Sequence, residues 1–284
     1  MAERVVQAGD LEIWTEDFGD PGDPTILLIA GAMAQAIIWP DELCRGLVDG
    51  GRHVIRYDHR DVGRSSTIDF ATSPYTISDM ADDAVAVLDG YSVATAHLVG
   101  HSLGGRIAQT VAVEQPDRVA SLTSWASTPS DTGMAGAEED LPGPTQELID
   151  AVSLMTQPVT GEEEWVERAV IAFRTFSGTL EPFDERGTRH LFQRMLARAR
   201  DVDSRLNHGM AALGSQGRTA DLRRVTAPTL VIHGTADRGL PLAHGEATAK
   251  AIPGARLLTI DGMGHDYPRA AFPQIIAAIL EHTR

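Results

Sequence analysis

The chain has 284 residues, with 24 Lys and Arg against 40 Asp and Glu, which gives a formal net charge of −16. This length fits one or two domains and is sufficient for a large buried core. Because so acidic a surface repels phosphate backbones and anionic lipid, nucleic acid and membranes are not expected partners.

The sequence also carries no sign of export or of membrane insertion. The first 30 residues are acidic and lack a basic segment followed by an apolar run, as a signal peptide requires. No stretch approaches 18 apolar residues, so no transmembrane helix is expected and a cytoplasmic location is predicted. The single cysteine, Cys44, excludes an intramolecular disulfide and is expected to be a small buried apolar residue.

Short apolar runs alternate with segments of helical period in the first half of the chain. Strands are predicted at residues 4–8, 12–16, 25–30, 53–57, 96–100 and 119–125. Helices are predicted at residues 39–48, 79–88 and 103–113, with Ser78 as the N-cap of the second. The first two strands are interpreted as edge strands joined by a turn at Gly9-Asp10. Alternating strands and helices predict a mostly parallel sheet covered on both faces.

The pattern changes over residues 130–218, which contain no convincing strand. Three amphipathic stripes with helical spacing lie there, at residues 148–155, 165–176 and 191–196. Strands return at 229–233 and 256–260, and helices at 241–252 and 268–282. We therefore predict the α/β fold class: residues 1–129 and 219–284 form one eight-stranded core, and residues 130–218 form a helical cap.

One motif indicates nucleophilic catalysis. Gly100-His-Ser-Leu-Gly104 matches G-x-S-x-G, and it follows a predicted strand and opens a predicted helix. The glycines remove Cβ atoms that would collide at so sharp a turn, and the helix N-terminus favours negative charge. Ser102 is therefore the candidate nucleophile, and its alternative role is that of an ordinary helix N-cap.

Two later residues complete a triad in chain order. Asp237 follows the strand at 229–233, and His265 follows the last strand in Asp261-Gly-Met-Gly-His265. Serine, aspartate and histidine then occur in the expected order, on loops at strand carboxyl ends. His265 is assigned as the base that takes the serine proton, and Asp237 as the acceptor that fixes its tautomer.

Other groups near these residues are assigned as follows. The N–H groups of Leu103 and Ala32 are predicted to form the oxyanion hole, since Ala32 follows the strand at 25–30. Asp131 follows the strand at 119–125 and stays open as an alternative acid. Asp261 and Asp266 are expected to be turn residues or to support His265.

Some motifs are missing or are interpreted as structural. His101 is expected to pack beside the nucleophile, and the H-x3-H spacing of His97 and His101 lies on strand and turn, which does not suit zinc. Neither G-x-G-x-x-G after a strand nor a phosphate-binding P-loop is present, so no cofactor and no metal are expected. Residues 58–65 (DHRDVGRS) are interpreted as a hydrogen-bonded loop beneath the active site.

Several further segments carry a family resemblance. They are Asp17-Phe-Gly-Asp-Pro21, Trp39-Pro-Asp-Glu42, Asp49-Gly-Gly51, His53-Val-Ile-Arg-Tyr-Asp-His-Arg-Asp61, Ala84-Val-Ala-Val-Leu-Asp-Gly90 and Gly262-Met-Gly-His265. With them the chain resembles the α/β-hydrolase superfamily along its whole length, and more narrowly the anthracycline methylesterases of the aclacinomycin type in polyketide antibiotic biosynthesis.

The resemblance implies a carboxylic-ester hydrolase that cleaves the C-10 methyl ester of a glycosylated tetracyclic aglycone, giving an acid primed to lose carbon dioxide. It implies the same roles for Ser102, Asp237 and His265, with Leu103 and Ala32 as oxyanion donors. The aclacinomycin-type elbow reads Gly-Leu-Ser-Met-Gly, whereas this chain has His101 and Leu103. The second oxyanion loop here is Ala30-Gly-Ala32 in place of a Gly-Gly pair.

The sequence therefore predicts a serine carboxylic-ester hydrolase with a small-molecule ester substrate, acting as a monomer or homodimer. Two alternatives keep the same fold: a cofactor-free haloperoxidase or perhydrolase, and a lactonase. A third alternative is a catalytically silent ligand-binding protein.

Overall fold

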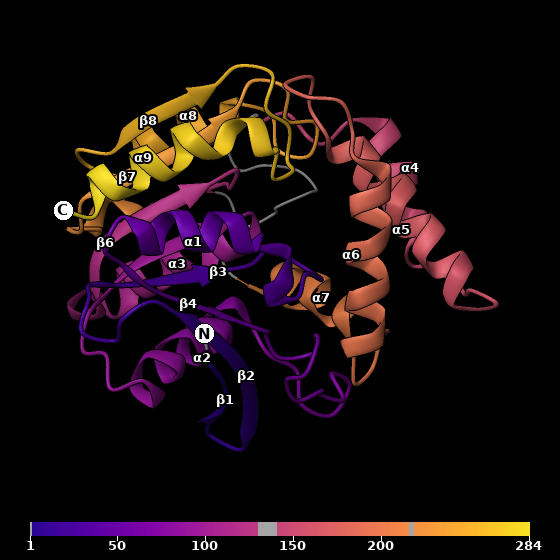
Figure 1. Cartoon of the computed structure of the whole chain (residues 1–284), viewed down its shortest axis with the longest axis horizontal. Coiled ribbons are helices and arrows are strands. Elements are labelled where there is room, and N and C mark those ends of the chain that lie inside the picture. Colours follow the sequence, from indigo (N-terminus) through magenta and orange to yellow (C-terminus); the bar gives the residue numbers. More distant parts are fainter. Residues whose placement is uncertain (1, 130–140, 216–218) are drawn as a thin grey trace.

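The computed structural model describes residues 2–129, 141–215 and 219–284. An eight-stranded sheet in the order β1-β2-β4-β3-β5-β6-β7-β8 forms its centre (Figure 1). The strands are β1 (Ala2–Ala8), β2 (Leu11–Phe18), β3 (Thr25–Ile29), β4 (His53–Tyr57), β5 (Ala96–His101), β6 (Val119–Trp125), β7 (Thr229–Gly234) and β8 (Arg256–Ile260). Strand β2 runs antiparallel to both its neighbours, and the pairings from β4 to β8 are parallel. The predicted α/β class with a mostly parallel sheet is confirmed.

Helices cover both faces of the sheet. One face carries α1 (Asp41–Asp49) and α9 (Phe272–His282), and the other carries α2 (Ile77–Gly90), α3 (Leu103–Glu114) and α8 (Ala243–Ala251). Strand β3 explains the layering, because Ile26 and Leu28 point into one core and Leu27 and Ile29 into the other. A continuous apolar run is therefore what a central parallel strand requires.

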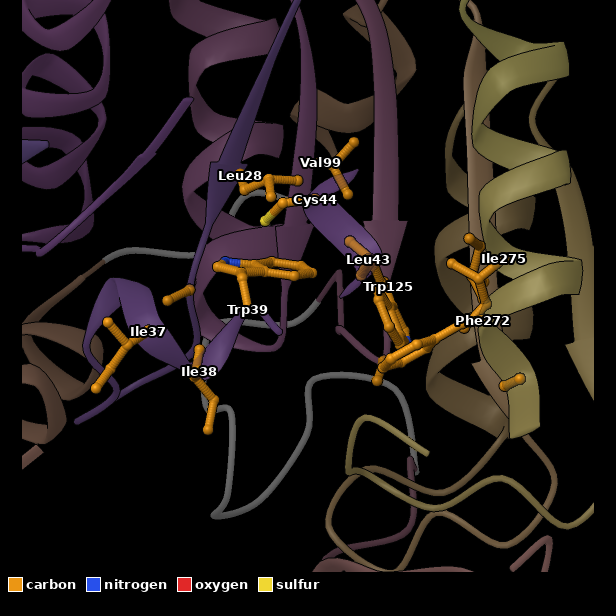
Figure 2. Close-up of a cluster of buried hydrophobic side chains, with 14 of the residues drawn as sticks. Leu28, Ile37, Ile38, Trp39, Leu43, Cys44, Val99, Trp125, Phe272 and Ile275 are labelled. Carbon is orange, nitrogen blue, oxygen red and sulfur yellow. The ribbon is translucent and has the colours of Figure 1, made fainter. Parts of the chain in front are cut away.

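The core beneath α1 and α9 is shown in Figure 2. Leu28 of β3 and Val99 of β5 lie above the Trp39 and Trp125 rings, and Phe272 of α9 closes the cluster from the other side. Cys44 of α1 is fully buried there, as the sequence predicted.

Three local predictions need correction. Helix α2 is capped by Thr76, because the Thr76 hydroxyl accepts from the Asp79 N–H while the Asp79 carboxylate accepts from the Thr76 N–H. Ser78 lies inside the first turn. Strand β2 is not an edge strand, since it pairs with β4 as well as β1. Helix α1 begins at Asp41, because Trp39 and Pro40 are in extended conformations.

Four helices lie between β6 and β7 in the described part of the chain. They are α4 (Gln146–Leu154), α5 (Glu162–Phe176), α6 (Glu185–Arg198) and α7 (Asn207–Gly214). The first three carry the amphipathic stripes, and α7 was not predicted. They lie at the end of the sheet toward which the parallel strands point (Figure 1). No helix of the described segments is long and apolar enough to cross a membrane.

Candidate active site

Ser102 lies at a sharp turn between β5 and α3. Its backbone is in the left-handed region, with φ of 54° and ψ of −120°. A Cβ atom on Gly100 would lie 2.1 Å from the Gly104 carbonyl oxygen, and one on Gly104 would lie 2.1 Å from the Ile29 carbonyl oxygen. Both contacts are with backbone, so the turn requires glycine at these two positions.

Three predicted site residues from separate loops form one hydrogen-bonded chain. The Ser102 Oγ lies 2.9 Å from Nε2 of His265, and Nδ1 of His265 lies 2.7 Å from Oδ2 of Asp237. The second carboxylate oxygen, Oδ1, accepts from the N–H groups of Gly239 and Leu240, at 2.8 Å each. The carboxylate is thereby held on both sides and presents Oδ2 to the imidazole.

The charge on Asp237 determines which ring nitrogen of His265 carries the hydrogen. Burial alone would raise the pKa of Asp237, but the neighbouring His265, the hydrogen bond from its ring and the backbone donors lower that pKa below its usual value. The ionised carboxylate can only accept, so Nδ1 of His265 carries the hydrogen and Nε2 presents its lone pair to Ser102. This is the arrangement needed to take a proton from a serine hydroxyl.

Two backbone amides are available beside Ser102. The Leu103 N–H stands at the N-terminus of α3, and the Ala32 N–H lies in the loop that follows β3. A Cβ atom on Gly31 would lie 3.3 Å from the Ser102 Cβ, so this loop passes directly beside the elbow. Within the described segments neither amide has a protein acceptor, which leaves both free to donate to a developing oxyanion.

The insert is attached to the histidine loop through Phe176, a residue that sequence reasoning assigned only to an apolar helix face. The Phe176 carbonyl accepts from the His265 N–H at 2.8 Å, and its ring lies 5.4 Å from the imidazole at a tilt of 32°. The N–H groups of Thr179 and Leu180 both donate to the Gly262 carbonyl. No periodic pattern in the sequence signals such contacts.

His101 packs behind the triad, as predicted. Its ring is buried among Trp39, Trp125 and Tyr267, with centroid distances of 4.5–6.4 Å, and it lies 4.9 Å from the ring of His265. Burial lowers the pKa of His101 well below its usual value, which keeps the ring neutral.

The other acidic residues that the sequence placed near the site are Asp131, Asp261 and Asp266. Asp131 lies outside the described residues. Asp261 is exposed and accepts from the Thr235 hydroxyl at 2.9 Å, as a turn residue does. Burial raises the pKa of Asp266.

In the 58–65 loop the buried Asp58 accepts from the N–H groups of Ala36 and Arg64, so this loop is hydrogen-bonded as expected. Across the described parts no three His, Cys, Asp or Glu residues are arranged to hold a metal.

A large groove opens beside the histidine loop. Its volume is about 860 Å³, and it is lined by residues from both the core and the insert. Its apolar wall includes Ile37, Ile38, Phe173, Phe183, Leu191 and Tyr267. Its rim also carries charged side chains, among them Asp41, Arg45 and Arg269, and neither Ser102 nor His265 is among the residues that line it.

Comparison with known proteins identifies the family of the chain. The family model described as the alpha/beta hydrolase fold matches residues 24–267. The rhodomycin D methylesterases DnrP of Streptomyces peucetius and DauP of Streptomyces sp. (strain C5) are 40% and 38% identical to this chain, and each match covers all of it and 99% of the relative.

Solved structures share the fold at lower identity. An esterase from Exiguobacterium antarcticum gives a TM-score of 0.80 at 20% identity, covering 98% of both chains. A bromoperoxidase from Bacillus anthracis gives 0.81 at 21% identity, covering 99% of both. The family match and the two full-length relatives show that the chain belongs to the α/β-hydrolase fold family.

Proposed function

We propose that this protein is a serine carboxylic-ester hydrolase that removes the methyl group from an anthracycline-type polyketide methyl ester. The observation that carries the chemistry is the continuous hydrogen-bonded chain from Ser102 through His265 to Asp237. The substrate class is supported by the full-length similarity to two rhodomycin D methylesterases. The groove of about 860 Å³ between the insert and the core has room for a ligand with several fused rings.

In the first step the Ser102 Oγ attacks the ester carbonyl carbon while Nε2 of His265 takes the hydroxyl proton. The carbonyl oxygen becomes an oxyanion that accepts from the N–H groups of Leu103 and Ala32. The bond from carbon to the methoxy oxygen then breaks, and the proton on His265 passes to that oxygen. Methanol leaves, and Ser102 carries the acyl group as an ester.

In the second step water is the nucleophile, and the same groups release the acyl group from Ser102. Nε2 of His265 takes a proton from the water, whose oxygen bonds to the acyl carbon. The bond from carbon to Ser102 Oγ breaks and the serine recovers its proton from His265. The product is a carboxylic acid, and the enzyme is unchanged. Asp237 stabilises the imidazolium that forms in both steps.

The proposal includes the domain division expected from the sequence. Residues 130–218 act as a cap over a core made of residues 1–129 and 219–284. We also propose that the protein is located in the cytoplasm and acts as a monomer or a homodimer.

The test is a set of methyl-ester polyketides and simple aryl esters, with product masses recorded. A product lighter by one methylene group, with release of methanol, is the expected result. Ser102→Ala should lower kcat by roughly 10⁴-fold or more, and a fluorophosphonate probe should label Ser102 in the wild-type protein. An S102A variant with wild-type activity would refute the serine mechanism, and faster turnover of a lactone or a perhydrolysis substrate would refute the substrate class.

A further inference from the structure

The loop that carries the Ala32 amide is short and has hydrogen bonds at both ends. It follows β3 and passes beside Ser102, and Met33 has a left-handed backbone with φ of 61°. Within the loop the Gly31 carbonyl accepts from the Ala34 N–H at 3.4 Å, and the residues at its two ends, Ala30 and Met33, are hydrogen-bonded to other elements. The position of the Ala32 N–H therefore depends in part on what fixes Ala30 and Met33.

His208 of α7 holds the end of this loop at Met33. The Met33 N–H donates to Nδ1 of His208 at 3.0 Å, across 175 residues of sequence. The other ring nitrogen, Nε2, lies 2.8 Å from the Arg60 carbonyl oxygen. A carbonyl oxygen can only accept, so Nε2 carries the hydrogen and Nδ1 has the lone pair that Met33 needs.

The surroundings of His208 support a neutral, fixed ring. His208 is fully buried, and burial lowers its pKa below the usual value. The start of α7 is attached to the same core loop, since Asn207 donates to the Asp61 carboxylate at 3.1 Å and the Ser204 hydroxyl to the Asp61 carbonyl at 2.8 Å. The imidazole is thus held in place as well as in tautomer.

His59 holds the other end. Its Nε2 lies 2.9 Å from the Ala30 carbonyl oxygen, and its ring meets that of His208 edge to face, with centroids 5.6 Å apart and an interplanar angle of 89°. Two buried imidazoles therefore hold the residues on either side of Gly31-Ala32. One belongs to the core and the other to the helical insert.

We propose that His208 is a positioning residue for acyl transfer: by accepting from the Met33 N–H, it holds the Ala32 amide where a tetrahedral oxyanion forms on the carbon attacked by Ser102. The inference rests on the proposed function. It gives the insert a part in the chemistry in addition to lining the groove, because α7 supplies a group on which the geometry of the oxyanion hole depends.

The experiment compares two replacements of similar size. His208→Leu removes the acceptor, whereas His208→Asn keeps an acceptor oxygen near the position of Nδ1. Loss of a whole oxyanion donor lowers kcat about 10²–10³-fold, so a displaced donor should cost about 10–100-fold. We expect H208L to show this loss in kcat with KM within about twofold, and H208N to recover most of it.

Two further measurements separate positioning from folding. A boronic acid inhibitor, whose adduct with Ser102 carries the tetrahedral oxyanion, should bind H208L more weakly, in proportion to the loss in kcat/KM. His282→Leu is the matched control, because His282 is hydrogen-bonded to the Leu122 carbonyl at 3.1 Å, away from the elbow. It should lower the melting temperature and leave kcat unchanged.

Each outcome has a defined meaning. If H208L has wild-type kcat and inhibitor affinity, or if H208N is as impaired as H208L, the positioning role is wrong. If H208L does not fold, His208→Ser replaces it, since the serine hydroxyl is too short to reach Met33. Activity in S102A refutes the proposed function and the positioning role together. An unchanged H208L in an enzyme that depends on Ser102 refutes the positioning role alone.

Discussion

Replacing Asp237 with asparagine tests the triad through the orientation that the structure imposes on the new side chain. Two backbone N–H groups, from Gly239 and Leu240, point at the carboxylate Oδ1 at 2.8 Å each. In D237N, the only orientation that satisfies both donors places the amide oxygen at this Oδ1 position. The NH₂ group of the new amide then faces the His265 ring.

The expected loss follows from this geometry. Two N–H donors cannot face each other at 2.7 Å, so His265 must move its hydrogen to Nε2 and can no longer accept from Ser102. The imidazolium formed during acylation also loses its counter-charge. At an effective dielectric constant of about 20, two unit charges about 4 Å apart attract by about 4 kcal/mol, which is a factor of about 10³ in rate. The unfavourable tautomer adds roughly another tenfold, so kcat should fall by about 10⁴.

The assay is kcat and KM for an aryl ester and for the methyl-ester substrate, with a thermal melt to verify folding. D237N should remain folded, because both backbone donors keep an acceptor, and its KM should change little. Asp261→Asn is the matched control, since Asp261 is an exposed turn residue, and it should keep wild-type kcat. A D237N variant within about tenfold of the wild-type kcat, together with an inactive Asp131→Asn variant, would refute the assignment of Asp237 as the acid.

Two further predictions concern stability. Gly104→Ala places a Cβ atom 2.1 Å from the Ile29 carbonyl oxygen, so α3 must move away from β3, and the free energy of unfolding should fall by about 3 kcal/mol or more. Gly143→Ala is the control, because a Cβ atom there meets open space. Equal melting temperatures for the two variants would contradict the packing argument. Burial, with the nearby His208, lowers the pKa of His59 from 6.5 to about 3, so the unfolded chain takes up this proton first and stability falls as pH drops from about 6.5 toward 3. His59→Gln should therefore reduce the slope of the free energy of unfolding against pH by about 1.4 kcal/mol per pH unit between about pH 6 and 4. Urea unfolding at a series of pH values measures this slope. Parallel curves for the variant and the wild type would show that His59 does not titrate in this way.

Features with local signals could be predicted from the residues alone. The apolar run of β3 and the alternation of strands and helices were sufficient for the α/β class, because a strand buried on both faces is almost continuously apolar. The elbow around Ser102 was equally readable, since its glycines are required by contacts with backbone only a few residues away or on the adjacent strand. Chain order and the turn context favoured Asp237 as the partner of Ser102 and His265, while Asp131 stayed open as an alternative acid. The distances within the triad came only from the structure.

The contacts between distant segments required the folded chain. Phe176 lies on a helix whose amphipathic pattern predicts burial but does not identify the buried partner, and His208 lies on α7, a helix that the sequence did not predict. Their contacts with His265 and with Met33 join residues far apart in the sequence. A hydrogen bond of this kind depends on the position and direction of two backbones, and residue periodicity along one helix carries neither. The chemistry at Ser102 could therefore be predicted from the sequence, whereas the support that the insert gives to the histidine and oxyanion loops became visible only in the fold.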